Sequence, residues 1–175
     1  DLRRILPAQA ELLVSRVASA PTVSADSLKA MAPLLTQSAA LLPRAAKLAA
    51  VGYGCTSATA QIGAAQIAAL IKDGVTTQAV TEPVSALLAA CAHLNIQRLA
   101  VITPYVASVS ERLHQVLREN GIEITACASF NEAVEANVVR ISANSVQAPA
   151  IQMGQHPDCD AVFLSCTNLR TLDVI

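Results

Sequence analysis

Two stretches of this chain read almost alike: "AVGYGCTS" at residues 50–57 and "AVFLSCTN" at residues 161–168. Each begins as a short apolar run, typical of a buried β-strand, and continues through Cys-Thr into a segment with helical spacing. A strand that passes through a turn into a helix is the repeating unit of α/β proteins. The two copies therefore predict two such units at distant points of the chain.

The same alternation extends over the rest of the sequence. Short β-branched runs predict strands at residues 11–17, 49–54, 76–80, 98–103, 122–130 and 160–165. Ala- and Leu-rich segments predict helices at residues 24–42, 58–72, 83–95, 106–119 and 142–154, and the start of a last helix at 167–175. The strands are continuous apolar runs, which favours a parallel sheet covered by helices on both faces. The predicted fold class is therefore α/β.

The composition limits the classes of function. Hydrophobic residues make up 53% of the 175 residues, without an apolar run long enough to span a bilayer, so we expect a packed protein outside the membrane. Aromatic residues are 2% and the net charge is −1, which provides neither the stacking platforms nor the basic patch of a nucleic-acid binder. Five cysteines without a CxxC pair suit reduced thiols in the cytoplasm. The expected partner is a small molecule.

Cys55 and Cys166 occupy the same place in the two related stretches. Ligands of parallel α/β folds bind at the carboxyl ends of strands, where turns and helix N-termini meet. Each cysteine follows a predicted strand and precedes a predicted helix, a setting that can lower a thiol pKa from about 8.5 toward neutrality. A single cysteine is more often a buried apolar residue, but two in one register, each followed by Thr, favour a shared role. Both are therefore candidate catalytic residues.

Three motifs, "GYGCTSAT" at residues 52–59, "VITPY" at 101–105 and "LSCTNLRTLDVI" at 164–175, resemble those of the aspartate/glutamate racemase superfamily. The chain is most similar to its branch of arylmalonate decarboxylases and maleate cis–trans isomerases, and the likeness covers nearly the whole sequence. It implies two pseudo-symmetric lobes, each with a parallel sheet flanked by helices. It also implies a cofactor-independent enzyme in which Cys55 and Cys166 face each other across a small carboxylate substrate.

Chemistry next to a carboxylate builds negative charge on its oxygens, so such a site needs aimed hydrogen-bond donors. Tyr105 matches the substrate-binding tyrosine position that the resemblance implies, and Asn137 in "EANVVRIS" resembles a substrate-amide position of the isomerases. The other candidate donors stand at predicted helix starts, where such residues also occur as ordinary N-caps. They are Thr56, Ser57, Thr167 and Asn168.

The residues around the two cysteines distinguish between the activities that the resemblance implies. Decarboxylases of this branch use the later cysteine and carry Gly at the earlier position, which is Cys55 here. Two thiols suit a two-base racemase, or an isomerase in which one thiolate adds to a double bond. Amino-acid racemases usually carry Asn-Thr after the first cysteine and Thr-His or Thr-Glu at the second, whereas this chain has Thr-Ser and Thr-Asn. We therefore expect an isomerase or racemase of a small dicarboxylate, with maleate isomerisation as the leading example. An arylmalonate-type decarboxylase, an Asp/Glu racemase and a non-catalytic carboxylate-binding module remain alternatives.

The resemblance divides the chain into lobes at residues 1–81 and 82–175. Family members carry a strand before the first lobe and a strand and helix after the second, so we expect this sequence to be a piece truncated at both ends. Exposed sheet edges would then favour a homo-oligomer.

Several other polar residues are expected to have no part in the chemistry. His93 and His114 are expected on the surface and Glu82 in a solvated turn. A strand between Cys159 and Cys166 would separate them by roughly 20 Å, which excludes a shared metal site with His156. Asp173 resembles a family position and is expected to have a structural role.

Overall fold

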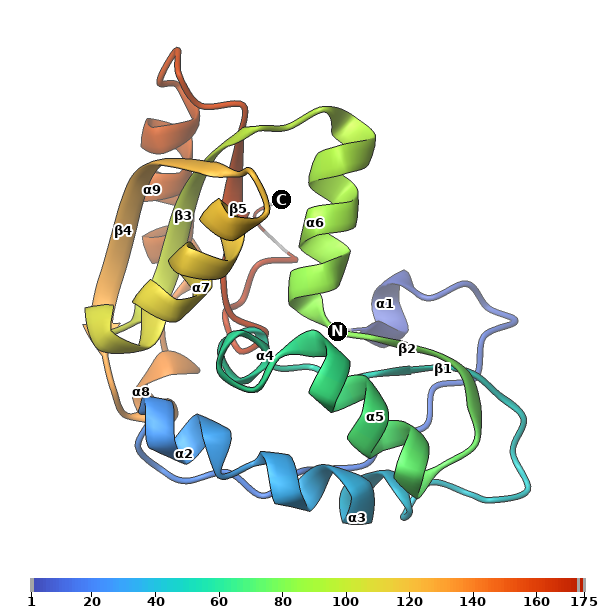
Figure 1. Ribbon diagram of the computed structural model, residues 1–175. Coiled ribbons are helices and arrows are strands. Elements are labelled where there is room, and N and C mark those ends of the chain that lie inside the picture. Colours follow the sequence, from blue (N-terminus) through green and yellow to red (C-terminus); the bar gives the residue numbers. More distant parts are fainter. Residues whose placement is uncertain (1, 173, 175) are drawn as a thin grey trace.

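The computed structural model describes residues 2–172 and 174 of the chain. Its strands form two parallel sheets, with strand orders β1-β2 and β4-β3-β5 (Figure 1). The strands are β1 (Leu48–Gly52), β2 (Thr77–Thr81), β3 (Arg98–Tyr105), β4 (Glu123–Glu132) and β5 (Ala161–Leu164). The helices are α1 (Leu2–Ile5), α2 (Ala25–Lys29), the 3-10 turn η1 (Ala32–Leu34), α3 (Leu35–Ala39), α4 (Thr56–Ile62), α5 (Ala64–Gly74), α6 (Pro83–Leu94), α7 (Ala107–Glu119), α8 (Glu135–Val138) and α9 (Ala143–Gly154).

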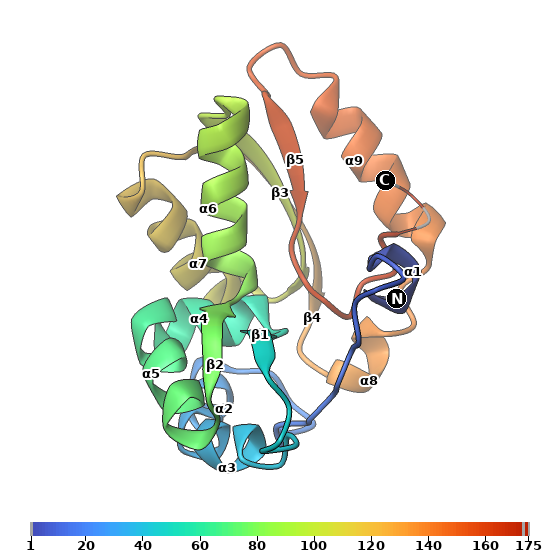
Figure 2. The ribbon, with the colours of Figure 1, turned by 90° about the vertical axis from the view of Figure 1, so that its right-hand side faces the viewer.

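Helices cover both faces of the larger sheet. Figure 2 shows α9 on one side of β3, β4 and β5, and α6 and α7 on the other. The smaller sheet is covered by α5, which packs against β2 and against α3. This arrangement confirms the predicted α/β class with parallel sheets flanked by helices. None of the described helices is long and apolar enough to cross a membrane.

Strand β3 is the centre of the larger sheet. Its residues from Leu99 to Tyr105 are all buried, because the strand is paired on both edges and covered on both faces. Leu99 and Val101 pack with Leu113 and Leu117 of α7 in one apolar cluster. This packing fixes the end of the strand, where Tyr105 stands.

A second apolar cluster joins elements of the two predicted lobes. It contains Leu35 and Ile67 from the first half of the chain, together with Tyr105, Val138 and Val146 from the second. The predicted boundary between residues 81 and 82 falls between β2 and α6. This apolar cluster contains residues from both sides of the boundary, so it does not separate the chain into two lobes. The division at residues 81 and 82 stays a prediction.

The prediction of a strand at residues 11–17 is wrong. These residues form no regular secondary structure, and their β-branched composition lacks a neighbouring strand with which to pair. The segment is held by isolated contacts instead, such as the bond of the Ser15 hydroxyl to the Ser38 carbonyl at 2.6 Å. Further along, Thr22 and Val134 form an isolated antiparallel bridge. Residues 11–22 therefore lie across the molecule as an extended segment, called the strap below.

Two predicted helices are each broken. The helix at residues 24–42 is divided into α2, η1 and α3, and Pro33 stands in η1, where its missing N–H interrupts the helical bonding. The helix at residues 58–72 begins earlier, at Thr56, and is divided into α4 and α5 at Gly63. That glycine has φ 95°, which costs glycine little and other residues much. The break lets α4 lie against α7 while α5 packs on α3.

Three further expectations need correction. Residues 167–172 form turns and not the start of a helix; Asp173 lies outside the described residues. Glu82 is 5% exposed, and its carboxylate accepts the amides of Val84 and Ser85 at the start of α6. His114 is buried as well, since α7 turns it toward β4.

Candidate active site

Cys55 lies in the turn that joins β1 to α4. The strand ends at Gly52 and the helix begins at Thr56, so Cys55 is the extended residue directly before the helix. Thr59 donates its amide to the Cys55 carbonyl at 3.0 Å and its hydroxyl to the same oxygen at 2.7 Å. These bonds fix the turn and present the half-buried thiol beyond the carboxyl end of β1.

Cys166 lies in the corresponding turn after β5. Ser165 donates its amide to the Ile102 carbonyl at 2.7 Å, which continues the pairing with β3 up to the cysteine. The Cys166 sulfur lies 3.3 Å from the Tyr105 hydroxyl and accepts the Asn168 amide at 3.3 Å. The thiol is thus held between the ends of two adjacent strands.

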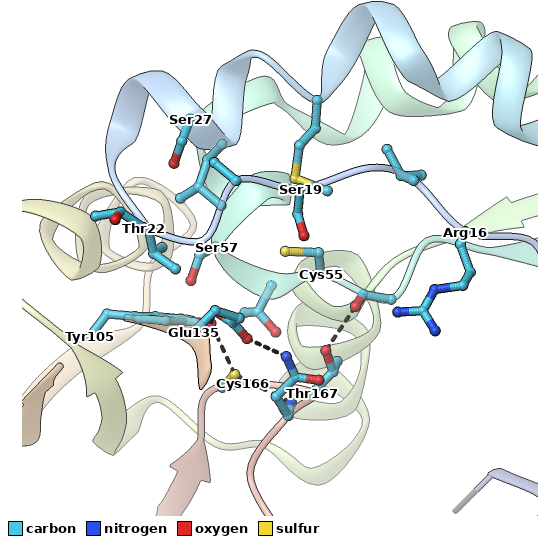
Figure 3. A pocket seen from close by; sticks show the side chains of 18 residues that line it. Arg16, Ser19, Thr22, Ser27, Cys55, Ser57, Tyr105, Glu135, Cys166 and Thr167 are labelled. Carbon is cyan, nitrogen blue, oxygen red and sulfur yellow. Dashed lines mark hydrogen bonds between the residues drawn. The ribbon is translucent and has the colours of Figure 1, made fainter. Parts of the chain in front are cut away.

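Both cysteines line one cavity of about 250 Å³. Figure 3 shows them at this cavity, Cys55 from the turn before α4 and Cys166 from the turn after β5. The cavity also brings together five of the predicted substrate-binding residues, which are Thr56, Ser57, Tyr105, Thr167 and Asn168. The described residues contain no cluster of three His, Cys, Asp or Glu side chains suited to a metal ion.

Asn137 is not among the residues that line this cavity, so its part in substrate binding stays a prediction. Its amide donates to the Glu132 carboxylate at 3.0 Å and is exposed. Residues two apart on a helix point to different sides, and Asn137 stands two residues after Glu135 in α8. As a result Glu135, and not Asn137, faces the cavity.

Glu135 is a site residue that the sequence reasoning did not identify. Its carboxylate accepts the Tyr105 hydroxyl at 3.1 Å and the side-chain amide of Asn168. Its backbone amide donates to the Pro21 carbonyl at 3.0 Å, which ties the start of α8 to the N-terminal strap. The only sequence signal was its place in the same short segment as Asn137.

Arg16 is a second residue that sequence reasoning missed. The strap that carries it lines the cavity together with Ser19 and Thr22, and Figure 3 shows these side chains on that wall. Among the described lining residues, Arg16 is the cation and Glu135 the anion. Assigning residues 11–17 to a strand hid this role, because a strand would have placed Arg16 in a sheet.

The two cysteine turns are joined directly. Thr167 donates its hydroxyl to the Gly54 carbonyl at 2.8 Å, across a sequence separation of 113 residues. This bond connects the residue after Cys166 to the residue before Cys55. It therefore sets how the two thiols lie relative to each other.

The environment raises the pKa of both thiols. Burial is the main cause for Cys55 and for Cys166, and the nearby charge of Glu135 adds to it. Backbone amides oppose this rise in pKa. At Cys55 these are the amides of Ala58 and Ser57. The expectation that a helix start brings these thiols toward neutrality is wrong, because burial of the sulfur costs the thiolate more than the amides return.

Comparison with known proteins gives the family. A model of the arylmalonate decarboxylase family matches residues 21–175. The arylmalonate decarboxylase of Bordetella bronchiseptica is 35% identical over 92 residues, which are 52% of this chain and 38% of that protein.

Solved structures agree on the fold. The maleate isomerase Iso of Pseudomonas putida S16 matches with a TM-score of 0.75 and 22% identity, over 89% of this chain and 65% of that chain. A liganded double mutant of arylmalonate decarboxylase matches with a TM-score of 0.76 and 24% identity, over 88% of this chain and 66% of that chain. The chain thus spans less than two thirds of these relatives. Because the family model covers both cysteine turns, the chain belongs to the arylmalonate decarboxylase family.

Proposed function

We propose that this protein is a cofactor-independent isomerase of a small dicarboxylate, with maleate-type cis–trans isomerisation as the leading example. The observation that carries the proposal is the presence of Cys55 and Cys166 at one cavity, each beyond the end of a parallel strand. Family membership adds that relatives are cysteine-dependent isomerases and decarboxylases.

The two thiols divide the chemistry between them. The Cys55 thiolate adds to one alkene carbon, a C–S bond forms, and the π electron pair moves to the neighbouring carbon beside a carboxylate. Cys166 donates its proton to that carbon, which leaves a thioether with a freely rotating C–C bond. After rotation, the Cys166 thiolate takes back a proton and the electron pair expels Cys55. The product is the trans diacid, and both cysteines return to their first state.

A solved relative supports this route. The maleate cis–trans isomerase of Nocardia farcinica, as a cysteine-to-serine mutant, holds a covalently bound succinylcysteine intermediate. A succinyl thioether is the species that addition of a thiol across maleate creates. We assign the corresponding bond to Cys55 in this chain.

The cavity offers partners for the carboxylates. The Ser57 side chain lines it and supplies a hydroxyl donor, and Arg16 supplies a positive charge. Such groups stabilise the negative charge that develops on a carboxylate when the carbon beside it carries an electron pair. The site thereby lowers the energy of the carbanion-like intermediate.

A decarboxylase is the second candidate, favoured by the family model and by the curated Bordetella bronchiseptica relative. In that reaction a substituted malonate loses carbon dioxide, and Cys166 protonates the resulting enediolate. Cys55 has no required part in it. The two candidates therefore differ in whether Cys55 is needed.

The test compares single substitutions in the full chain. Cys55→Ala and Cys166→Ala are assayed with maleate, an aryl malonate, aspartate and glutamate, and Cys127→Ala at an exposed cysteine serves as the control. We expect maleate turnover that Cys127→Ala retains, that Cys55→Ala abolishes, and that Cys166→Ala lowers at least about 100-fold.

Each other outcome has a defined meaning. Carbon dioxide release from an aryl malonate that survives Cys55→Ala would assign the decarboxylase. Aspartate or glutamate racemisation would assign a racemase. Carboxylate binding in a thermal-shift assay without any turnover would identify a binding module and end the isomerase proposal.

A further inference from the structure

Glu135 contacts two groups that both contact Cys166. Its carboxylate accepts the hydroxyl of Tyr105 at 3.1 Å, and that hydroxyl lies 3.3 Å from the Cys166 sulfur. The same carboxylate accepts the side-chain amide of Asn168, whose backbone amide donates to the sulfur at 3.3 Å. Figure 3 shows Tyr105, from the end of β3, and Glu135, from α8, beside Cys166.

The number of protons determines the direction of these bonds. A tyrosine hydroxyl has one proton to donate. When Glu135 accepts it, the hydroxyl oxygen can only accept from Cys166, which requires a protonated thiol. A Cys166 thiolate would need the Tyr105 proton for itself, and the Glu135 carboxylate would then lose its bond to the hydroxyl. A chain from S–H to O–H to carboxylate is therefore the consistent arrangement.

We propose that Glu135 is a positioning residue that keeps Cys166 protonated by accepting the single hydroxyl proton of Tyr105. The proposal rests on the proposed function in one respect: in both candidate reactions Cys166 must give a proton to carbon. Glu135 thereby makes the two cysteines unequal, since Cys166 is held as the acid and Cys55 remains to act as nucleophile. No proton is transferred to Glu135 itself in this scheme.

The charged and titratable groups around Cys166 agree with this assignment. Cys55 faces it from the turn before α4, Tyr105 from the end of β3, and Glu135 from α8. Arg16 lines the cavity from the strap and is exposed to solvent, where its charge is screened. Burial and the Glu135 charge both raise the pKa of the Cys166 thiol, whereas the Asn168 amide that donates to the sulfur lowers it. A bond donated by the Tyr105 hydroxyl would lower it as well, and Glu135 withdraws that bond by accepting the same proton.

The test measures thiol reactivity, which needs no substrate. Cys166 in the full chain is alkylated with iodoacetamide at about pH 7.5, and each cysteine is followed by peptide mass spectrometry. Glu135→Gln replaces the charged acceptor of the Tyr105 proton by a weaker neutral amide oxygen, so the thiolate can compete for that proton, and it removes a negative charge. We expect alkylation of Cys166 to become about tenfold faster, equal to a fall of about one unit in its pKa.

Two further variants separate the hydrogen bond from a general charge effect. Glu123→Gln makes the same charge change at an exposed residue at the far end of β4, and we expect it to leave the Cys166 rate unchanged. Tyr105→Phe removes the linking hydroxyl, so adding Glu135→Gln to it should accelerate alkylation no more than about twofold. An unchanged Cys166 rate in Glu135→Gln overturns the proposal. So does a tenfold acceleration that persists without the Tyr105 hydroxyl.

The pH profile of turnover provides a second readout. If Cys166 is the acid, kcat/KM falls at alkaline pH as its thiol loses the proton, and Glu135→Gln should move this fall about one unit lower. A profile that Glu135→Gln leaves in place overturns the proposal. The alkylation result is independent of substrate identity, so failure of the isomerase assignment is distinguishable from failure of the Glu135 assignment.

Discussion

The hydroxyl of Thr167 donates to the carbonyl of Gly54 at 2.8 Å and joins the two cysteine turns. We predict that Thr167→Val, which keeps the shape and removes the donor, lowers kcat about tenfold while KM changes less, because the thiols lose their fixed relation. Thr167→Ser keeps the hydroxyl and should retain most activity. Steady-state kinetics with both variants checks this, and equal losses in the two would contradict it.

Arg16 should act on binding more than on chemistry. Arg16→Gln removes the cation among the described lining residues, so KM for a dicarboxylate should rise about tenfold with a smaller change in kcat. Because the guanidinium is exposed, the difference should shrink in high salt. Kinetics at two ionic strengths measure both effects. A loss confined to kcat would show that Arg16 does not act through substrate binding.

The activity should increase with pH above neutrality. Burial raises the pKa of Cys55, so at neutral pH only a small fraction is thiolate, and that fraction grows as pH rises. We expect kcat/KM to rise from about pH 7 to about pH 9, up to tenfold per unit. Rates measured across this interval provide the check. A flat profile would mean that thiolate formation at Cys55 does not limit the reaction.

Gly74 stands where α5 meets α3 without room for a side chain. A Cβ there would collide with the Thr36 carbonyl oxygen, so Gly74→Ala should lower the free energy of unfolding by about 2 to 3 kcal/mol. Gly52→Ala is the matched control, since its Cβ would meet Thr81 at an ordinary 3.9 Å. Urea unfolding of both variants gives the comparison. Equal midpoints would show that α3 moves aside.

His114 should make the fold sensitive to acid. Burial lowers the pKa of His114 below the ordinary value of a histidine, so the folded state favours the neutral ring. The stability that the neutral ring contributes is present above the pKa of His114 in the unfolded chain. It is lost as pH falls through the lower pKa of His114 in the folded protein. His114→Gln should therefore reduce the fall of Tm between about pH 7 and about pH 5. His93→Gln, at an exposed histidine, should leave that slope unchanged.

The sequence by itself determined the class of fold and the position of the two thiols. The apolar run 99–102 is buried between layers in β3, and the two Cys-Thr turns also follow apolar runs, although β1 is partly exposed. These are local patterns, because a strand and the helix after it are read within about twenty residues. Pro33 and Gly63 are local signals too, since proline lacks the helical N–H donor and glycine tolerates φ 95°, but whether a helix continues through them depends on what it packs against.

Only the tertiary structure decided the composition of the site. Glu135 reaches Tyr105 and Asn168 over 30 and 33 residues, and Arg16 arrives on a strap that pairs with no sheet. The direction of the thiol pKa values was also a tertiary result, because burial depends on everything packed around the sulfur. Burial and long-range hydrogen bonds depend on distances in space, which the spacing of residues along a chain does not contain.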